Sequence, residues 1–352
     1  MHNLSIGLDS HKGCMIPNIF VTIGIPTYNR LAYLKEAVDS ALSQTYANCE
    51  LLISQNPHDD PDIRREVTEY CQHLVTLDPR VRYDRRDRNV GAPANFQWLV
   101  DNARGEYIIL IGDDDHLLPN AVESLVNGLS TDVVVSFGRR HIIDDRGRRL
   151  PRFVAPANPD AYFFEGWPYS QYIVPTGCLD SPELWAWRQA MGVETSLIRT
   201  QDFRRIRYRE DIDMPDLEFF IFLAREGGKF CFVPQYVTEY RFHPNSTTGG
   251  GFSNFKELFD DLEHLCVDAK IQPYKRKLLE WLAFKAVSKS LIVGDLDSVR
   301  RLLRHEYYPA AGTTGKKGRI IKVSAALPRN LGPAAYRLLY AIKFGRKYRN
   351  MI

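Results

Sequence analysis

The sequence predicts an α/β fold with a mostly parallel central sheet, and two patterns support this prediction. Short apolar runs rich in β-branched residues alternate with segments in which apolar side chains recur every three or four positions. Three of these runs end in clusters of polar residues. Because ligands of open α/β sheets bind beyond the carboxyl ends of the strands, these clusters locate the predicted site.

The first strand is predicted at 19–25, where Ile-Phe-Val-Thr-Ile-Gly-Ile is typical of a buried parallel strand. It stops at Pro26-Thr-Tyr-Asn29, and the apolar spacing from Leu31 onward predicts a helix, for which Asn29 is a better N-cap than Arg30. The alternation continues with strands at 49–54, 81–83, 107–111, 133–137 and 230–233. Further helices are predicted at 93–103, 119–129, 217–226, 256–305 and 333–348.

The strand at 107–111 ends in Gly112-Asp-Asp-Asp115. Asp113 and Asp115 are two positions apart, so their side chains point the same way in extended backbone. Two carboxylates at the carboxyl edge of a sheet predict a site for Mg²⁺ or Mn²⁺, which can then bind phosphate oxygens. The alternative is a solvated acidic turn. The apolar strand before these residues and the helix start at Leu117-Leu118-Pro119 favour the site.

The composition is that of an ordinary soluble globular protein, with 44% hydrophobic and 25% charged residues. No stretch approaches 18 consecutive apolar residues, and residues 1–17 form a leader without the layout of a signal peptide. The six cysteines are scattered and include no CxxC pair, which argues against a disulfide framework or a zinc site and favours a cytoplasmic protein. Residues 307–352 contain ten Lys or Arg and no Asp or Glu.

The run Val21-Thr-Ile-Gly-Ile-Pro-Thr-Tyr-Asn-Arg30 resembles the opening of family 2 glycosyltransferases of the GT-A fold, as does Ala41-Leu-Ser-Gln-Thr-Tyr46. Four later segments are similar to that family in order and spacing: Asn89-Val-Gly91, Asn95, Ala103-Arg-Gly-Glu-Tyr107 and Gly112-Asp-Asp-Asp-His-Leu-Leu-Pro119. Each motif alone is weak, but the ordered set, which spans about residues 19 to 250, is specific.

The resemblance implies an inverting, metal-dependent transfer of a sugar from a nucleotide-diphosphate sugar to an acceptor hydroxyl. It divides the chain into a leader (1–17), a nucleotide-sugar-binding half (18–137), an acceptor-binding half of the same GT-A domain (138–250) and a helical C-terminal region with a basic amphipathic tail (251–352). A UDP-sugar is the expected donor, with dTDP and GDP as alternatives. The acceptor is expected to be a glycan or a lipid-linked saccharide at the inner face of the membrane.

The resemblance also implies roles for residues of the first half. The expected nucleotide-sugar-binding residues of this half are Pro26, Thr27, Tyr28, Asn29, Arg30, Gln55, Asn56, Arg88, Asn95, Asp113 and Asp114. Gln55 stands where the family usually has an acidic residue that reads the base, and an amide both donates and accepts hydrogen bonds, so the base stays open. Arg88 either pairs with the pyrophosphate or is a surface arginine.

Met214-Pro-Asp-Leu-Glu-Phe219 resembles the family segment that carries the catalytic carboxylate. Inversion requires a base that deprotonates the acceptor hydroxyl, and Asp216 matches its position best. Glu218 is the alternative, although it points about 200° away along a helix. Asp216 could instead be a first-turn acid that complements the helix dipole. The family often has Glu where Pro215 stands, so the usual acidic pair is incomplete.

Tyr240-Arg-Phe-His-Pro-Asn-Ser246 resembles the end of the transferase core. Arg241 is expected to contact phosphate. His243 is expected to reach either the metal held by Asp113 and Asp115 or the diphosphate; the alternative for His243 is a structural hydrogen bond. Together with a divalent cation, these groups would stabilise the charge that develops on the leaving diphosphate.

Trp185, Trp187 and the aromatic residues of 162–172 either stack on acceptor sugars or pack in the core. The tail helix at 333–348 is basic, with Leu338, Leu339 and Ile342 on one side. That pattern favours peripheral contact with an anionic membrane over nucleic-acid binding, unless the apolar side packs on the catalytic domain.

Two other functional classes are compatible with an α/β fold and an acidic metal site. A nucleotidyltransferase that forms sugar nucleotides would need a Gly-rich phosphate loop after the first strand, where this chain has Pro26-Thr-Tyr-Asn29. A non-catalytic protein that binds nucleotide-sugars or glycans would be favoured by the loss of Asp115 or Asp216, and both are present.

Overall fold

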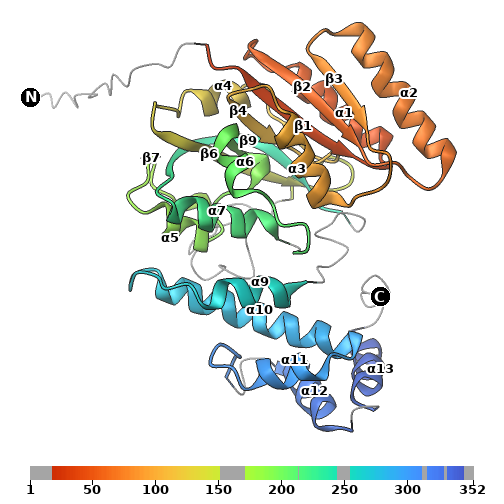
Figure 1. Ribbon diagram of the computed structural model, residues 1–352, viewed down its shortest axis with the longest axis vertical. Helices are drawn as coiled ribbons and strands as arrows, with labels where there is room; N and C mark the ends of the chain where they lie inside the picture. The colour runs from red at the N-terminus through yellow and green to blue at the C-terminus, as the bar shows by residue number, and fades with distance from the viewer. Residues whose placement is uncertain are drawn as a thin grey trace, which may run out of the picture.

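The computed structural model describes residues 18–150, 171–212, 214–243, 254–310, 315–328 and 331–344. A sheet flanked by helices forms one end of the molecule, and the C-terminal helices form the other (Figure 1). The predicted leader 1–17, the aromatic residues between 162 and 169, and residues 345–348 of the predicted tail helix lie outside the described residues.

Within the described part of the chain, the strands form one nine-stranded sheet in the order β3-β2-β1-β4-β8-β6-β9-β5, with β7 paired to β9. Their bounds are β1 Val21–Thr27, β2 Cys49–Gln55, β3 Val81–Arg85, β4 Tyr107–Leu110, β5 His116–Leu117, β6 Val133–Ile143, β7 Gly177–Cys178, β8 Ser196–Arg199 and β9 Lys229–Arg241. The first four strands in this order are parallel, as predicted. Beyond them β8 runs antiparallel to both β4 and β6, β9 is parallel to β6, and β5 and β7 are antiparallel to β9.

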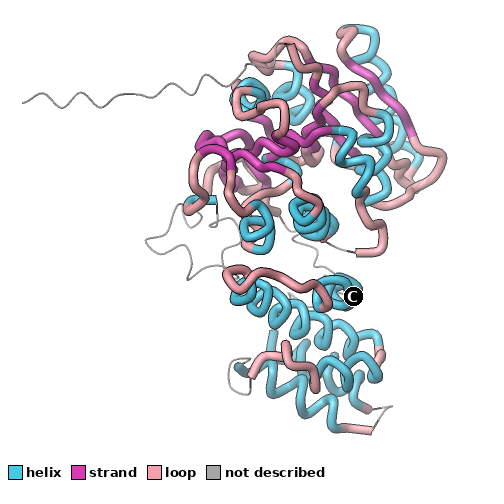
Figure 2. The backbone as a smooth tube through the Cα atoms, turned by 60° about the vertical axis from the view of Figure 1, so that its left-hand side comes forward, coloured by secondary structure: helices cyan, strands magenta, loops and turns pink. Residues whose placement is uncertain are grey.

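Helices cover both faces of this sheet (Figure 2). Those of the sheet domain are α1 Leu31–Leu42, α2 Pro61–Leu77, α3 Ala92–Asn102, α4 Ala121–Val126, α5 Pro182–Trp187, α6 Thr200–Ile206 and α7 Pro215–Arg225, with the 3-10 turn η4 Val193–Thr195. The C-terminal helices are α9 Phe255–Glu263, α10 Gln272–Val293, α11 Leu296–Leu303, α12 Gly315–Ala326 and α13 Gly332–Phe344.

Alternation along the strands creates two separate cores. Alternate residues of β1 (Val21, Ile23, Ile25) join buried side chains of α1, α2 and α4 on one face. The other face of the sheet, which includes Ile108 and Leu110 of β4, is covered by α3, α5, α6 and α7. Strands buried on both faces explain why β1 and β4 are almost continuously apolar in sequence.

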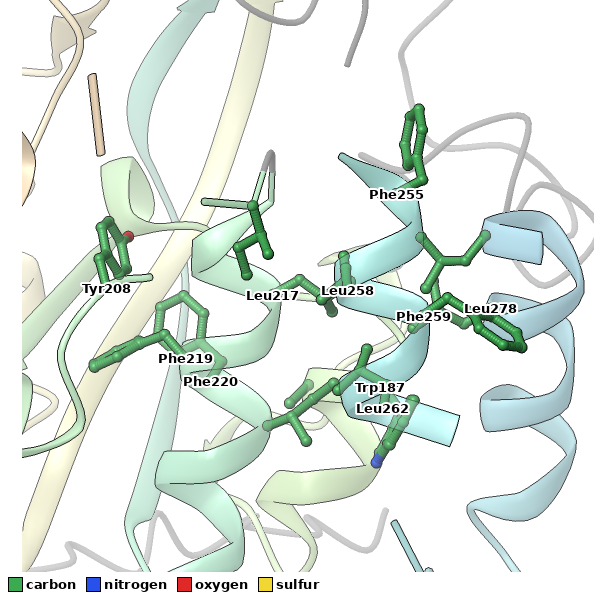
Figure 3. Close-up of a cluster of buried hydrophobic side chains, with 14 of the residues drawn as sticks. Trp187, Tyr208, Leu217, Phe219, Phe220, Phe255, Leu258, Phe259, Leu262 and Leu278 are labelled. Atoms are coloured by element: carbon green, nitrogen blue, oxygen red, sulfur yellow. The ribbon is translucent and has the colours of Figure 1, made fainter. Parts of the chain in front are cut away.

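The second core continues into the C-terminal helices. Leu217 and Phe219 of α7 belong to the same apolar cluster as Leu258 and Phe259 of α9 and Leu278 of α10 (Figure 3). Residues 256–305, which were predicted to be helical throughout, form three helices, α9, α10 and α11, separated by short connections. Gly294 takes a left-handed conformation (φ 87°) at the end of α10. Helix α7, which begins at Pro215, is thus packed between the sheet on one side and α9 and α10 on the other, and this fixes its position.

Helix α1 begins differently from the prediction. Arg30 occupies the N-cap position, and no side-chain hydrogen bond caps the helix. Its guanidinium instead turns toward Asp113 and Asp114, so the residue that starts this helix contributes to the acidic loop described next.

Candidate active site

A cavity of about 340 Å³ opens where β1, β2 and β4 end. It is lined by Pro26, Thr27, Tyr28, Arg30, Asn56, Ala92, Pro93, Asn95, Phe96, Leu110, Gly112, Asp113, Asp114, Asp115, Arg140, Val193, Glu194, Tyr208, Ile212, Met214, Pro215, Asp216 and Tyr240. Residues separated by more than 200 positions in the chain thus face one space. This is the carboxyl-edge location expected of ligand sites in such sheets.

The acidic loop is held tightly on the side of β1. Thr27 Oγ1 donates to Asp113 Oδ2 at 2.7 Å, and the Arg30 guanidinium contacts both Asp113 and Asp114. Gly112 allows the loop to fold back, because a Cβ at this position would lie 2.5 Å from Asp114 Oδ1. Burial, together with the neighbouring Asp114 charge, raises the pKa of Asp113 even though Arg30 opposes the shift.

Arg241 holds the other side of the loop and does not line the cavity. Its backbone N–H donates to Asp115 Oδ1 at 2.9 Å, and its Nε donates to the Asp114 carbonyl at 2.8 Å. Its guanidinium also pairs with Glu36 at 2.6 Å. Arg241 was predicted to contact phosphate, but its buried side chain is committed to these protein groups, so it positions the loop.

The three predicted metal ligands do not converge in this structure. His243 Nε2 lies 2.9 Å from Asp114 Oδ2, whereas Asp113 contacts Thr27 and Arg30. Among the described residues, no group of three or more His, Cys, Asp or Glu side chains has the geometry to hold a metal ion. Burial and the adjacent Asp114 carboxylate raise the pKa of Asp115 well above its usual range, while the contacts of Asp114 with His243 and Arg30 outweigh its burial and lower its pKa.

The predicted nucleotide-binding loop lines the cavity from Pro26 to Tyr28 and again at Arg30. The ring of Tyr28 lies 4.8 Å from that of His58. Asn56 and Asn95 also line the cavity, and their side chains brace its wall. Asn56 Nδ2 donates to the Gly91 carbonyl at 3.0 Å, and Asn95 exchanges hydrogen bonds with Ser54. Gly91, in a left-handed conformation (φ 83°), makes the turn into α3.

Besides Arg241, three predicted binding residues lie outside the cavity lining. Asn29 and Arg88 are exposed at the surface. Gln55 is fully buried and faces α2: its Nε2 donates to the Arg64 carbonyl at 3.0 Å, and its Oε1 accepts from Thr68 and Tyr83. Any contact of Gln55 with a base would therefore need this network to rearrange.

Asp216 lies in the first turn of α7 and faces the cavity, where it is half-buried. Burial and the negative charge of Glu194 raise the pKa of Asp216 to about 6, against the opposing effects of the Leu217 N–H and of Arg140. A carboxylate with such a pKa is ionised at neutral pH and still basic enough to accept a proton. The alternative base, Glu218, is not part of the cavity lining and points toward Arg209, 3.6 Å away.

Sequence reasoning missed Arg140, Glu194 and Tyr208. Arg140 and Glu194 form a buried ion pair beside Asp216, and Gln171 Oε1 accepts from the Arg140 backbone N–H at 2.7 Å. The three residues come from β6, η4 and the turn after α6, where the sequence shows no periodic pattern. The signal in the sequence that could have identified them is only that they are charged or polar residues.

The predicted acceptor-stacking tryptophans do not line the cavity. Trp187 is fully buried in the core, and its Nε1 donates to Glu183 Oε1 at 3.2 Å, so the packing alternative holds for it. Trp185 is half-buried and lies next to Arg188, whose guanidinium carbon is 4.8 Å from the centre of the indole ring.

The charge of the cavity wall is predominantly negative. Its lining carries five carboxylates, Asp113, Asp114, Asp115, Glu194 and Asp216, against two guanidinium groups, Arg30 and Arg140. An anionic ligand such as a diphosphate would be repelled by this wall unless a cation accompanied it.

Residues 22–179 match the family described as Glycosyl transferase family 2. Over 139 residues, the chain is 30% identical to an uncharacterized glycosyltransferase of Rickettsia felis. That stretch is 39% of this chain and 22% of the relative, so the chain spans about a fifth of the relative's length. Asp216, Arg241 and His243 lie beyond the residues that match the family.

Two solved structures share the fold over nearly the whole chain. S. aureus TarS 1–349, in complex with UDP-GlcNAc, has a TM-score of 0.52 at 11% identity, covering 93% of this chain and 92% of that one. The mannosyltransferase PcManGT from Pyrobaculum calidifontis, in complex with GDP-Man and Mn²⁺, has a TM-score of 0.53 at 13% identity, covering 95% and 90%. These likenesses confirm the predicted fold class.

Proposed function

We propose that this chain, whose residues 22–179 match glycosyltransferase family 2, transfers a sugar from a nucleotide-diphosphate sugar to a saccharide hydroxyl with inversion. One observation carries the proposal. The loop after β1, the acidic loop after β4 and the start of α7 all face a single cavity. A donor and an acceptor bound there would have Arg30 and Asp113–Asp115 on one side and Asp216 on another.

In the proposed reaction, the acceptor oxygen bonds to the anomeric carbon as the bond from that carbon to the diphosphate breaks. Asp216 takes the proton of the acceptor hydroxyl, and its pKa of about 6 suits this role at neutral pH. Arg30 is the cationic side chain nearest the acidic loop and is proposed to contact the leaving diphosphate.

Asp113 and Asp115 fit a divalent cation of the Mn²⁺ or Mg²⁺ type by their chemistry. Such ions are usually held by one or two carboxylates together with substrate phosphates, so a complete cage of protein ligands is not required. Buried carboxylates with raised pKa values would be relieved of their mutual repulsion by a cation. When bound, the ion would neutralise charge on the diphosphate; His243 is proposed to act through Asp114.

The base of the donor is proposed to lie against Tyr28 and Asn56, which line the cavity beside β2. TarS was solved with UDP-GlcNAc and PcManGT with GDP-Man, so both kinds of base occur with this fold. We keep UDP as the proposed base, with dTDP and GDP as alternatives.

The function can be tested by following release of nucleoside diphosphate from UDP-GlcNAc and GDP-mannose, with a panel of saccharide acceptors and Mn²⁺. We expect acceptor-dependent release by the wild type and its loss in Asp216→Asn. Glu218→Gln, on the same helix but outside the cavity, is the matched control and should retain turnover. Formation of a sugar nucleotide from a sugar phosphate would identify a nucleotidyltransferase, and donor binding without turnover a non-catalytic protein.

We further propose that α12 and α13 make peripheral contact with an anionic membrane, where a lipid-linked acceptor would lie. Tyr336 turns inward and its hydroxyl contacts Ser288 of α10, whereas Leu338 and Leu339 are 62% and 37% exposed. Four basic residues of these helices, Lys316, Arg319, Lys322 and Arg337, are exposed as well, and Lys317 is half-buried. None of the described helices is long and apolar enough to cross a membrane.

Flotation with vesicles of phosphatidylcholine and phosphatidylserine tests this contact. The intact chain should float at low salt and be released at high salt, because each basic residue near an anionic surface contributes about 1 kcal/mol that salt screens. Leu338→Glu/Leu339→Glu should stay in solution, whereas Leu77→Glu, an exposed leucine on α2, should float like the wild type. Equal flotation of all three would remove α13 as the contact.

A further inference from the structure

Tyr208 lines the cavity, and its buried hydroxyl has no hydrogen-bond partner among the described residues. Its side chain is 6% exposed. A buried tyrosine hydroxyl is normally hydrogen-bonded, since an unpaired one costs the desolvation of the group. An orphaned hydroxyl at the wall of a ligand cavity therefore points to a partner supplied by the ligand.

The ring that carries this hydroxyl is fixed from several sides. The Tyr208 backbone N–H donates to Gln97 Oε1 at 2.8 Å. The ring packs edge-on against Phe219, with a centroid distance of 5.7 Å (Figure 3). It also packs edge-on against Phe203 and Phe96, at 4.9 and 6.4 Å. These contacts hold the ring of Tyr208 in place between the aromatic core and the cavity.

The surroundings of Tyr208 select a ligand that accepts a hydrogen bond from it. Burial and the charges of Asp216 and Glu194 raise the pKa of Tyr208 well above its usual value, so the phenol stays protonated and remains a donor. Asp216, when ionised, only accepts. A sugar hydroxyl can accept from one neighbour and donate to another, which suits a position between these two groups.

We propose that the Tyr208 hydroxyl binds a hydroxyl of the sugar that lies next to Asp216 and thereby determines substrate specificity. This inference rests on the proposed function and deepens it. The sugar hydroxyl belongs either to the donor sugar or to the acceptor, because both meet near Asp216 in the reaction.

The test begins with stability, which separates a ligand-binding hydroxyl from a structural one. Tyr208→Phe removes only an oxygen without a protein partner, so its thermal midpoint without ligand should equal or exceed that of the wild type. Tyr107→Phe is the matched control, because the Tyr107 hydroxyl is also buried but donates to the Val133 carbonyl at 2.7 Å, and its loss should lower the midpoint. A midpoint for Tyr208→Phe as low as that of Tyr107→Phe would overturn the proposal.

The second measurement locates the sugar hydroxyl. Tyr208→Phe should bind UDP or GDP as the wild type does but lose about tenfold in kcat/KM for transfer. If the loss is in the KM for acceptor, the hydroxyl belongs to the acceptor; if it is in affinity for UDP-GlcNAc or GDP-mannose, it belongs to the donor sugar. Where this hydroxyl is not the nucleophile, a deoxy analogue that lacks it should cost the wild type about tenfold more in kcat/KM than it costs Tyr208→Phe, which has already lost the hydrogen bond from Tyr208.

Different results would overturn the proposed function and the role of Tyr208. A wild type that neither binds nor turns over any of these nucleotide-sugars would overturn the proposed function and the role of Tyr208 with it. Normal transfer by Tyr208→Phe, with every deoxy analogue penalised equally in both proteins, would overturn the role of Tyr208 alone.

Discussion

Replacing Asp216 with asparagine should make the protein more stable at neutral pH while abolishing sugar transfer. In the folded protein, burial and Glu194 raise the pKa of Asp216 from 3.8 to about 6. Folding therefore favours the protonated carboxyl, and its ionisation at higher pH opposes folding. The difference corresponds to at most about 3 kcal/mol, and to less because part of the carboxylate contacts the open cavity.

Ionisation of Asp216 makes the stability of the wild type depend on pH over a defined range. Above about pH 6 the full destabilisation by the charged Asp216 is present, and it fades as the pH falls from about 6 toward 3.8. Asparagine carries no such charge. Urea unfolding should show Asp216→Asn to be about 1–3 kcal/mol more stable than the wild type at pH 7.5. The difference between the two proteins should shrink on acidification.

Turnover of the same variant should fall on the order of a hundredfold or more, because the acceptor hydroxyl loses its base. Affinity for the nucleoside diphosphate should remain. A variant that is less stable than the wild type at pH 7.5, or whose stability difference does not change with pH, would refute the account of the Asp216 environment. Near-normal turnover would refute its role as base.

Three further predictions concern the rest of the cavity. Below about pH 6 the kcat/KM for transfer should fall about tenfold per pH unit. Glu194→Gln should move this acidic limb of the pH profile to lower pH, because it removes the negative charge that helps raise the pKa of Asp216. An acidic limb that stays in place would contradict the effect of Glu194 on Asp216. Excess EDTA should abolish transfer and Mn²⁺ or Mg²⁺ restore it, and full activity in the chelator would remove Asp113 and Asp115 as metal ligands. Gln55→Ala should lower the thermal midpoint, because Thr68 and Tyr83 lose an acceptor, and leave the ranking of UDP, dTDP and GDP in competition unchanged; a changed ranking would show that Gln55 reads the base.

The elements that the sequence predicted well are those with strong local patterns. The apolar runs of β1 and β4 are buried on both faces, and the acidic loop follows β4 as expected. Burial in a parallel arrangement requires such runs, so the pattern and the structure have the same physical cause. The convergence of Pro26–Tyr28, Arg30, Asp113–Asp115 and Asp216 in one cavity also follows from the carboxyl-edge rule together with the resemblance.

Side-chain orientation was harder to predict, because it depends on contacts made far along the chain. Gln55 ends its strand at the expected edge, but its amide faces Thr68 and Tyr83, which no local pattern reveals. Arg241 lies near the site but hydrogen-bonds to Glu36, more than 200 positions earlier. The pair Arg140–Glu194 joins two segments without periodicity, and its position beside Asp216 depends on the antiparallel strand β8.

The pairing of β5 with β9 limits how this protein could be recombined with a relative. His116, directly after the acidic loop, lies opposite Glu239, and the backbone of Arg241 at the end of the same strand binds Asp115. A chimera joined at residue 179, where the family match ends, would take the acidic loop from one parent and the strand that holds it from another. In such a chimera β8, which lies between β4 and β6 in the sheet, would also come from the second parent. Crossovers should therefore fall after β9, so that one parent contributes every strand, and acceptor preference should be exchanged by grafting side chains onto an intact sheet.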